Sequence, residues 1–247
     1  MRLIYFSLMI CWCTWTIPTF AGILSENTRV VYDESASSKS FIIVNKNTYP
    51  ILVQTWVDYG LGYPNKENAP FVVYPPVFKM KPDAIQVLKI IYTGDKTVTD
   101  KELQFWLNLY EIPGKNKEQW SKESESTNRL GLSVQTQLKL FYRPKKIVHM
   151  NVEDVAKQLK FYLKKSDHQV FLVCKNPTPY FISFSKIELI SDVNHIVIED
   201  HLDQMVAPQS EQAYPVKHNV TDIKDIAFSL ISDDGFAYSF QYNFFSF

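Results

Sequence analysis

The sequence predicts an all-β protein with two β-sandwich domains, and three observations support this prediction. The chain has 247 residues, which exceeds the ~100 residues that one sandwich needs and is close to the size of two. Its 7 glycines, 13 prolines and 15% aromatic residues are typical of strands joined by fixed turns. Helical periodicity is weak throughout, and its best candidate, residues 152–159, is expected to lead into a strand.

The first domain is expected over residues 22–144. Seven β-rich runs separated by turn residues mark its strands, at 28–32, 40–45, 49–59, 71–74, 84–92, 103–112 and 130–142. This number and spacing of runs favours an immunoglobulin-like sandwich. Pro144 and the two lysines after it form a rigid, polar segment that ends the last strand, which indicates a domain boundary.

The second domain is expected over residues 145–247, as a smaller sandwich of the same kind. Its β-rich runs lie at 161–163, 170–175, 180–189, 195–199, 212–215, 226–232 and 238–245. Only one cysteine, Cys174, lies beyond residue 21, so an internal disulfide cannot stabilise either domain. Each domain must therefore be held by its own core.

Residues 1–21 have the pattern of a secretory signal peptide. A positive start at Arg2 precedes an apolar run over residues 3–17, and small residues lead to Ala21, where cleavage is expected. No later segment is apolar for long enough to span a bilayer, so stable membrane insertion is not expected. Cys11 and Cys13 lie in the leader, and the remaining Cys174 is expected to be a buried, inert thiol.

The charge balance excludes one class of partner. The 26 Lys and Arg residues offset the 26 Asp and Glu residues, so the net charge is zero. No long basic stripe supplies the electrostatic attraction that nucleic-acid binding requires. We therefore expect a protein or peptide partner and no nucleic acid.

One strand, residues 130–140, is unusual in its length. Its apolar residues Leu130, Leu132, Val134, Leu138 and Leu140 occupy alternate positions, so one face is apolar, with Thr136 as the interruption. The run covers 11 residues, about twice the common strand length. The alternation alone favours a strand that packs on its own core, whereas the length favours an apolar edge that pairs with another chain.

Five segments carry a resemblance to a known family. They are NTRVVYD (27–33), YPPVFKMKPDA (74–84), DKELQFWLNLYEIP (100–113), LKLFYRP (138–144) and NPTPY (176–180). In this order they resemble the periplasmic chaperones of the chaperone–usher pilus pathway, the PapD-like family. The resemblance implies two immunoglobulin-like domains set at an angle with a cleft between them, a periplasmic location, and no cofactor, metal or catalytic activity.

The resemblance also implies a mechanism and the residues that serve it. Such a chaperone binds, folds and caps fimbrial subunits by lending them a strand, here 130–140, and delivers them to the outer-membrane usher. Leu130, Leu132 and Val134 match the residues that fill the groove of the subunit. Arg29 and Lys139 match the anchor of the subunit's terminal carboxylate, a role that suits the chemistry of both cations. Glu102, Arg143 and Asp233 match the charge cluster between the domains.

The sequence departs from the family pattern at three places. Leu103 replaces a small polar residue, Gly114 replaces a second proline, and the C-terminal region lacks a cysteine pair. The polar loop 114–129 favours the long-loop subgroup of the family, although the disulfide that often flanks the donor strand in that subgroup is missing. An apolar strand edge also makes self-association of the unoccupied chaperone a possible property.

Two other interpretations start from different residues. A metal-dependent exported enzyme would use His195, Glu199, Asp200, His201 and Asp203, which include metal-ligand types but show no recognised ligand spacing. A secreted immunoglobulin-like adhesion protein would use the sequence Asn219–Val220–Thr221 as a glycosylation site, but the Cys, Trp, Cys arrangement of such domains is missing.

Overall fold

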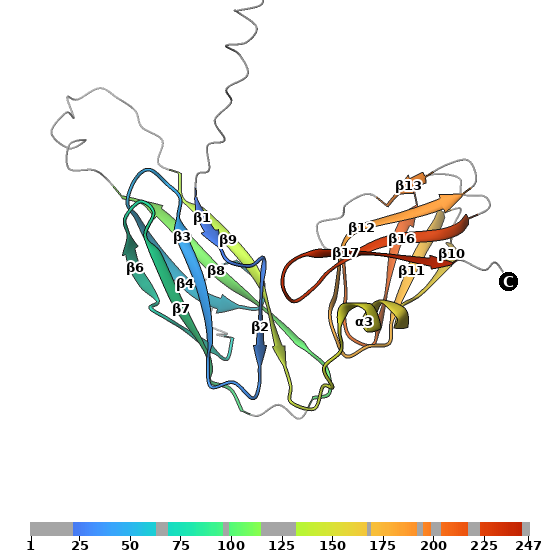
Figure 1. Cartoon of the computed structure of the whole chain (residues 1–247), viewed down its shortest axis with the longest axis horizontal. Helices are drawn as coiled ribbons and strands as arrows, with labels where there is room; N and C mark the ends of the chain where they lie inside the picture. The colour runs from blue at the N-terminus through green and yellow to red at the C-terminus, as the bar shows by residue number, and fades with distance from the viewer. Residues whose placement is uncertain are drawn as a thin grey trace, which may run out of the picture.

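The computed structural model describes residues 22–62, 69–95, 99–114, 132–166, 169–191, 195–198, 204–216 and 223–243. These residues form two β-rich lobes, and Figure 1 shows the lobes set at an angle and meeting near the start of β8 and the end of β9. In the described part of the chain, no helix is long and apolar enough to cross a membrane. The all-β, two-sandwich prediction is confirmed.

The first lobe is a sandwich of two sheets. One sheet has the order β1-β3-β7-β5 and the other β2-β9-β8-β4-β6. The strands are β1 (Ile23–Ser25), β2 (Arg29–Asp33), β3 (Lys39–Asn45), β4 (Ile51–Asp58), β5 (Phe71–Tyr74), β6 (Val77–Met80), β7 (Ile85–Tyr92), β8 (Leu103–Pro113) and β9 (Val134–Arg143).

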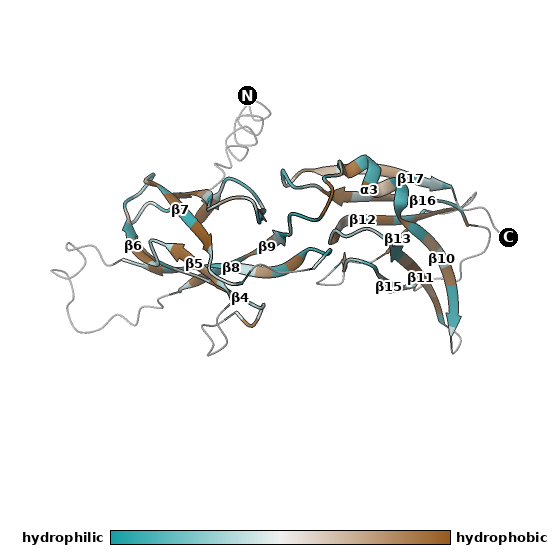
Figure 2. Ribbon diagram, turned by 90° about the horizontal axis from the view of Figure 1, so that it is seen from below, coloured by the Kyte–Doolittle hydropathy of each residue, from teal (hydrophilic) through white to brown (hydrophobic). Residues whose placement is uncertain are grey.

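The core of this lobe follows the alternation of its strands. Ile51, Val53 and Val57 point inward from β4, and Leu107 and Leu109 do so from the neighbouring β8. The second sheet covers them with buried residues of β3, β5 and β7. In Figure 2 brown apolar stretches lie within the strands of both lobes.

The second lobe begins with the one short helix of the described chain. Helix α3 (Val152–Gln158) is capped by Asn151, whose side chain accepts a hydrogen bond from the Asp154 amide, and the chain passes directly into a strand, as expected. The strands are β10 (Lys160–Ser166), β11 (Gln169–Asn176), β12 (Ile182–Ser191), β13 (His195–Val197), β14 (Met205–Val206), β15 (Ser210–Val216), β16 (Ile223–Ile231) and β17 (Ala237–Asn243). They form the sheets β10-β11-β15 and β13-β12-β16-β17, and β14 pairs with β12.

Both lobes use a buried asparagine at the end of a strand. The side-chain amide of Asn45 donates to the carbonyls of Tyr49, Met80 and Lys81. Asn176 does the same with the carbonyls of Tyr180, Val206 and Ala207, and both residues are fully buried. Each asparagine therefore satisfies carbonyls at the ends of short strands and in the turns beside them.

Three short strands, β1, β6 and β14, were not expected from the sequence. They have 3, 4 and 2 residues, too few for an alternating pattern to stand out. The expected strand at 130–140 also has different limits, because β9 starts at Val134 and continues to Arg143. Its ladder with β8 ends at the pair Glu111–Val134, shortly before Pro113, which has no amide to donate.

Candidate functional site

Strand β9 has one edge that is covered only in part. On one side it pairs with β8 from Val134 to Tyr142. On the other side it pairs with β2, in parallel, from Lys139 to Arg143. Within the described residues, the second edge of Val134–Leu138 has no strand against it. This half of β9 presents unpaired backbone groups to a partner.

The apolar side chains of this segment also divide, between Val134 and Leu138. Leu138 and Leu140 are buried in the core, with exposed fractions of 8% and 0%. Leu132 and Val134 belong to the same alternating face but are 69% and 44% exposed. The third expected groove residue, Leu130, lies outside the described residues, as does most of the loop 114–129. We call residues 132–138, which comprise the uncovered part of β9 and the two residues before it, the open half of β9.

The two expected anchor residues are neighbours in the sheet. Arg29 pairs in register with Lys139, on the face of the sheet opposite the core residues Val30 and Leu140. The guanidinium carbon of Arg29 lies 5.7 Å from the centre of the Phe141 ring, and Lys139 Nζ lies 5.9 Å from the Trp106 ring centre. The parallel pairing of β2 with β9 therefore brings two cations together, 110 residues apart in sequence.

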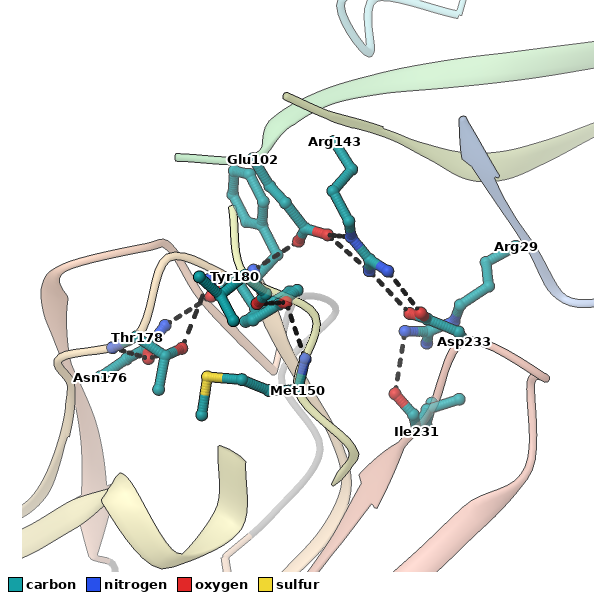
Figure 3. Close-up of polar contacts among 11 residues, drawn as sticks. Arg29, Glu102, Arg143, Met150, Asn176, Thr178, Tyr180, Ile231 and Asp233 are labelled. Atoms are coloured by element: carbon teal, nitrogen blue, oxygen red, sulfur yellow. Dashed lines mark hydrogen bonds and ion pairs between the residues drawn. The ribbon is translucent and has the colours of Figure 1, made fainter. Parts of the chain in front are cut away.

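Arg29 is a buried cation with one hydrogen-bond donor that has no partner among the described residues. Its exposed fraction is 6%, its Nη1 donates to the carbonyl of Ile231 at 3.0 Å, and its Nε is buried with no partner among the described residues (Figure 3). Burial lowers the pKa of Arg29, and the charges of Asp233, Glu102 and Asp234 oppose this effect. A carboxylate that enters here would supply both the charge and the acceptors that the guanidinium lacks.

The three residues of the expected charge cluster come together between the lobes (Figure 3). Arg143 donates from Nε to Glu102 at 2.8 Å and from Nη1 to Asp233 at 2.7 Å, with a further bond from Nη2 to Asp233 at 3.0 Å. Burial works against the charge of Arg143, yet the bonds and charges of Asp233 and Glu102 raise its pKa. Arg143 therefore stays charged and holds one carboxylate from each lobe.

Backbone contacts extend this junction. The other carboxylate oxygen of Glu102 accepts from the Phe181 amide at 2.8 Å, and the Glu102 amide donates to the Pro179 carbonyl at 2.9 Å. Burial raises the pKa of Glu102, while the charge of Arg143 and the Phe181 amide oppose that rise. The start of β8 is thus fixed to the turn that precedes β12.

Tyr180 is a residue of this site that sequence reasoning missed. The Arg143 guanidinium carbon lies 4.9 Å above its ring centre, and its hydroxyl donates to the Val148 carbonyl at 2.6 Å and accepts from the Met150 amide at 3.1 Å. Tyr180 stands in the NPTPY segment, but no spacing rule in a sequence pairs it with Arg143. Its ring stacks on the planar cation and its hydroxyl fixes the segment between the lobes.

A cavity of about 570 Å³ lies between the lobes beside these residues. Its walls include Arg29, Phe141 and Arg143 from the first lobe and Val155, Tyr180 and Asp233 from the second. The hairpin between β16 and β17 reaches the first lobe here, since a side chain at Gly235 would come within 2.9 Å of the Thr28 hydroxyl. The expected cleft is therefore present, with cations on one wall and both lobes around it.

The residues of the two alternative interpretations are mostly beyond what the structure describes. Glu199, Asp200, His201 and Asp203 lie outside the described residues, and so does the sequence 219–221. The described residues contain no group of three or more His, Cys, Asp or Glu side chains that could hold a metal ion. Cys174 is fully buried, as expected, and burial raises its pKa to about 12.

Comparisons with known proteins decide the family. A model described as the pili and flagellar-assembly chaperone, PapD N-terminal domain, matches residues 22–148. A model of the C-terminal domain of the pili assembly chaperone PapD matches residues 154–242. The chain belongs to the PapD-like family of pilus assembly chaperones.

Two curated relatives of this chaperone show the extent of the similarity. The probable fimbrial chaperone YadV of Escherichia coli strain K12 is 31% identical over 80% of this chain and 79% of its own length. The chaperone protein FimB/FhaD of Bordetella pertussis strain Tohama I is 31% identical over 87% of this chain and 85% of its own.

Solved structures agree with the fold of the chaperone. The crystal structure of the YadV chaperone covers 90% of this chain and 99% of its own, with a TM-score of 0.73 and 29% identity. A structure of the Salmonella enterica SafA pilin in complex with the SafB chaperone covers 92% of this chain and 99% of its own, with a TM-score of 0.72 and 26% identity.

These findings confirm the family resemblance and the role of the protein as a fimbrial chaperone rather than an enzyme. Chaperones of this pathway are periplasmic proteins. Membership of the family also decides against the metal-dependent enzyme and the adhesion protein.

Proposed function

We propose that this chaperone binds, folds and caps fimbrial subunits by pairing them with the open half of β9, and then delivers them to the outer-membrane usher. The observation that carries this proposal is the uncovered edge of Val134–Leu138 beside the exposed side chains of Leu132 and Val134. Backbone pairing would supply direction and register, and the alternate apolar side chains would fill the groove of the subunit.

The expected strength of this pairing supports a stable complex. Each large apolar side chain that moves from water into a groove contributes about 1.5–3 kcal/mol. Leu130, Leu132 and Val134 together would contribute on the order of 5–9 kcal/mol before the ordering costs of binding. The similarity to a chaperone solved with its pilin is in accord with this mode of binding.

Two cations of the cleft would fix the C-terminal end of the bound subunit. In this proposal Arg29 and Lys139 bind the C-terminal carboxylate of the subunit, and Glu102, Arg143 and Asp233 set the angle of the cleft around it. The supporting facts are the adjacent positions of Arg29 and Lys139 and the Nε of Arg29, which has no hydrogen-bond partner in the described part of the chain. A planar guanidinium binds a carboxylate through parallel hydrogen bonds, and an ammonium adds a compact charge.

The remaining parts of the proposal concern processing and assembly. Export would end with cleavage after Ala21, which leaves an N-terminal domain to residue 144 and a C-terminal domain from residue 145. Assignment to the long-loop subgroup stays a prediction, because residues 115–131 lie outside the described residues. The same apolar edge would allow two unoccupied chaperones to associate.

Coexpression with fimbrial subunits from the same genome tests the proposal. The wild-type chaperone should yield a soluble one-to-one complex on gel filtration, and Arg29→Ala or Lys139→Ala should abolish it. Lys89→Ala, at an exposed lysine of β7, is the matched control and should leave the complex intact. Full recovery of the complex with both cleft variants would overturn the anchor assignment. Failure of the wild-type chaperone to retain any subunit would overturn the function itself.

A further inference from the structure

The face of β9 that points away from the core carries a polar arrangement of its own. Gln135, Gln137 and Lys139 alternate with the apolar residues and lie beside the outward residues of β8. The register places Gln137 opposite Asn108 and Lys139 opposite Trp106. On the next strand, β4, Trp56 and Asp58 continue these two rows. The open half of β9 therefore has a polar reverse side.

Asn108 is the centre of this reverse side. It is fully buried, although it points away from the core, and its Oδ1 accepts from the amide of Gln135 at 2.8 Å and from that of Gln137 at 3.0 Å. Its own amide donates to the Trp106 carbonyl at 3.2 Å. One buried acceptor thus holds two side chains of the open half of β9.

A loop lies against the two glutamines that bind Asn108. The Asp58 carboxylate, 3% exposed, accepts from the backbone amides of Gly60 at 2.7 Å and Gly62 at 3.2 Å, and from the Trp56 indole at 3.1 Å. The Gly62 carbonyl in turn accepts from the Gln135 amide at 2.6 Å. The carboxylate folds residues 58–62 back over the sheet, and the loop then binds the open half of β9.

Both glycines of this loop are required by geometry. Gly60 has φ of +99° and Gly62 has φ of +76°, conformations that other residues rarely adopt. A side chain at Gly60 would come within 2.8 Å of the Trp106 indole, whose ring also lies beside Lys139. The loop, the Trp106 indole and the proposed anchor residue Lys139 therefore lie next to one another.

The open half of β9 needs such support for a physical reason. Among the residues that the structure describes it has a strand on one side only, and its apolar side chains Leu132 and Val134 are exposed. A strand half with one ladder and little buried surface opens easily, and an opened donor strand must be ordered again when it binds. Hydrogen bonds on its reverse side lower this cost without covering the edge or the groove-filling face.

We propose that Asn108, Gln135, Gln137 and the Asp58–Gly62 loop form a positioning device that holds the open half of β9 extended and ready to pair. The proposal rests on the function proposed above, because a strand that is not donated to a subunit would not need to be kept extended with its edge uncovered. None of these side chains belongs to the alternating face that would fill a subunit's groove, so their part in binding is indirect.

Amide hydrogen exchange of the whole mature chaperone tests the device without any ligand. Asn108→Leu removes the shared acceptor, and the pair Gln135→Ala with Gln137→Ala removes the donors from the exposed side. We expect either variant to speed exchange in residues 132–138 by about tenfold, while β3, β7 and the second lobe keep the wild-type rates. Gln86→Ala, which removes a half-buried glutamine of β7, is the matched control.

The same variants are then coexpressed with a fimbrial subunit that the wild-type chaperone retains. We expect the complex to dissociate about tenfold faster, with the melting temperature of the unoccupied chaperone unchanged for the glutamine variant. Unchanged exchange at 132–138, or faster exchange throughout the first lobe, would overturn the positioning role. A wild-type chaperone that retains no subunit would overturn the proposed function instead, and the exchange result would still report on the device.

Discussion

Arg143→Met is expected to weaken the first lobe more than any exposed substitution. The Arg143 and Glu102 side chains are 10% and 2% exposed and lie 2.7 Å apart. Methionine fills much of the space but leaves the Glu102 carboxylate buried with the backbone amide of Phe181 as its remaining hydrogen-bond donor among the described residues. Removal of one member of a buried ion pair costs about 3–5 kcal/mol, and we expect a loss of this size.

The other bond of Arg143 should matter less for stability. Asp233 has a side chain that is 51% exposed, so water replaces much of what Asp233→Asn removes. We expect Asp233→Asn to cost at most about 1 kcal/mol. The double variant Glu102→Gln with Arg143→Met should recover part of the loss of Arg143→Met, because no charge is then left buried.

Urea unfolding read by tryptophan fluorescence measures these changes. In a protein produced from residue 22 onward the tryptophans are at 56, 106 and 120, so this signal reports on the first lobe, while circular dichroism reports on both. A shift below about 1 kcal/mol for Arg143→Met would refute the reasoning. So would a double variant that is less stable than Arg143→Met alone.

Three further outcomes follow from burial and hydrogen bonding. Leu132→Ser and Val134→Ser should each change the free energy of unfolding by less than about 0.5 kcal/mol, because both residues are exposed. In a binding titration each variant should bind a subunit about tenfold or more weakly than the wild type. A loss of stability without a loss of binding would count against strand donation. Asn176→Ala should cost about 3 kcal/mol in circular-dichroism unfolding, since three carbonyls lose their donor, and a cost below 1 kcal/mol would contradict this. With its pKa raised to about 12, the Cys174 thiol stays protonated at pH 8, so a chromogenic disulfide reagent should label the mature protein only after denaturation, and rapid labelling of the folded protein would contradict its burial.

Much of the fold could be predicted from the sequence because alternation and turn residues are local signals. The long runs at 49–59 and 103–112 became β4 and β8, whereas β14, with 2 residues, leaves no such signal. Alternation shows which residues of a strand share a face, but not which of them another sheet covers. Leu132 and Leu140 belong to one pattern, and only the tertiary arrangement exposes the first and buries the second.

The candidate site shows the same limit. Arg29, Lys139, Glu102, Arg143 and Asp233 could be named from family motifs, and the structure brings them to one region of the molecule. Residues that act through shape rather than through a motif could not be named. Asn108 looks like an ordinary polar residue of a strand, and nothing in the sequence shows that it is fully buried or that its side-chain oxygen accepts from both Gln135 and Gln137.

The division of β9 also separates what evolution must keep from what it can change. From Leu138 onward a substitution affects the stability of the chaperone itself, because these residues lie in its core or pair with β2. Leu132 and Val134 are exposed and Thr136 is half-buried, so substitutions at these three positions affect mainly the contact with the partner. Single substitutions at Leu132, Val134 and Thr136 could therefore adapt the chaperone to a fimbrial subunit whose groove has changed. A library varied at these three positions is a practical route to chaperones for new subunits.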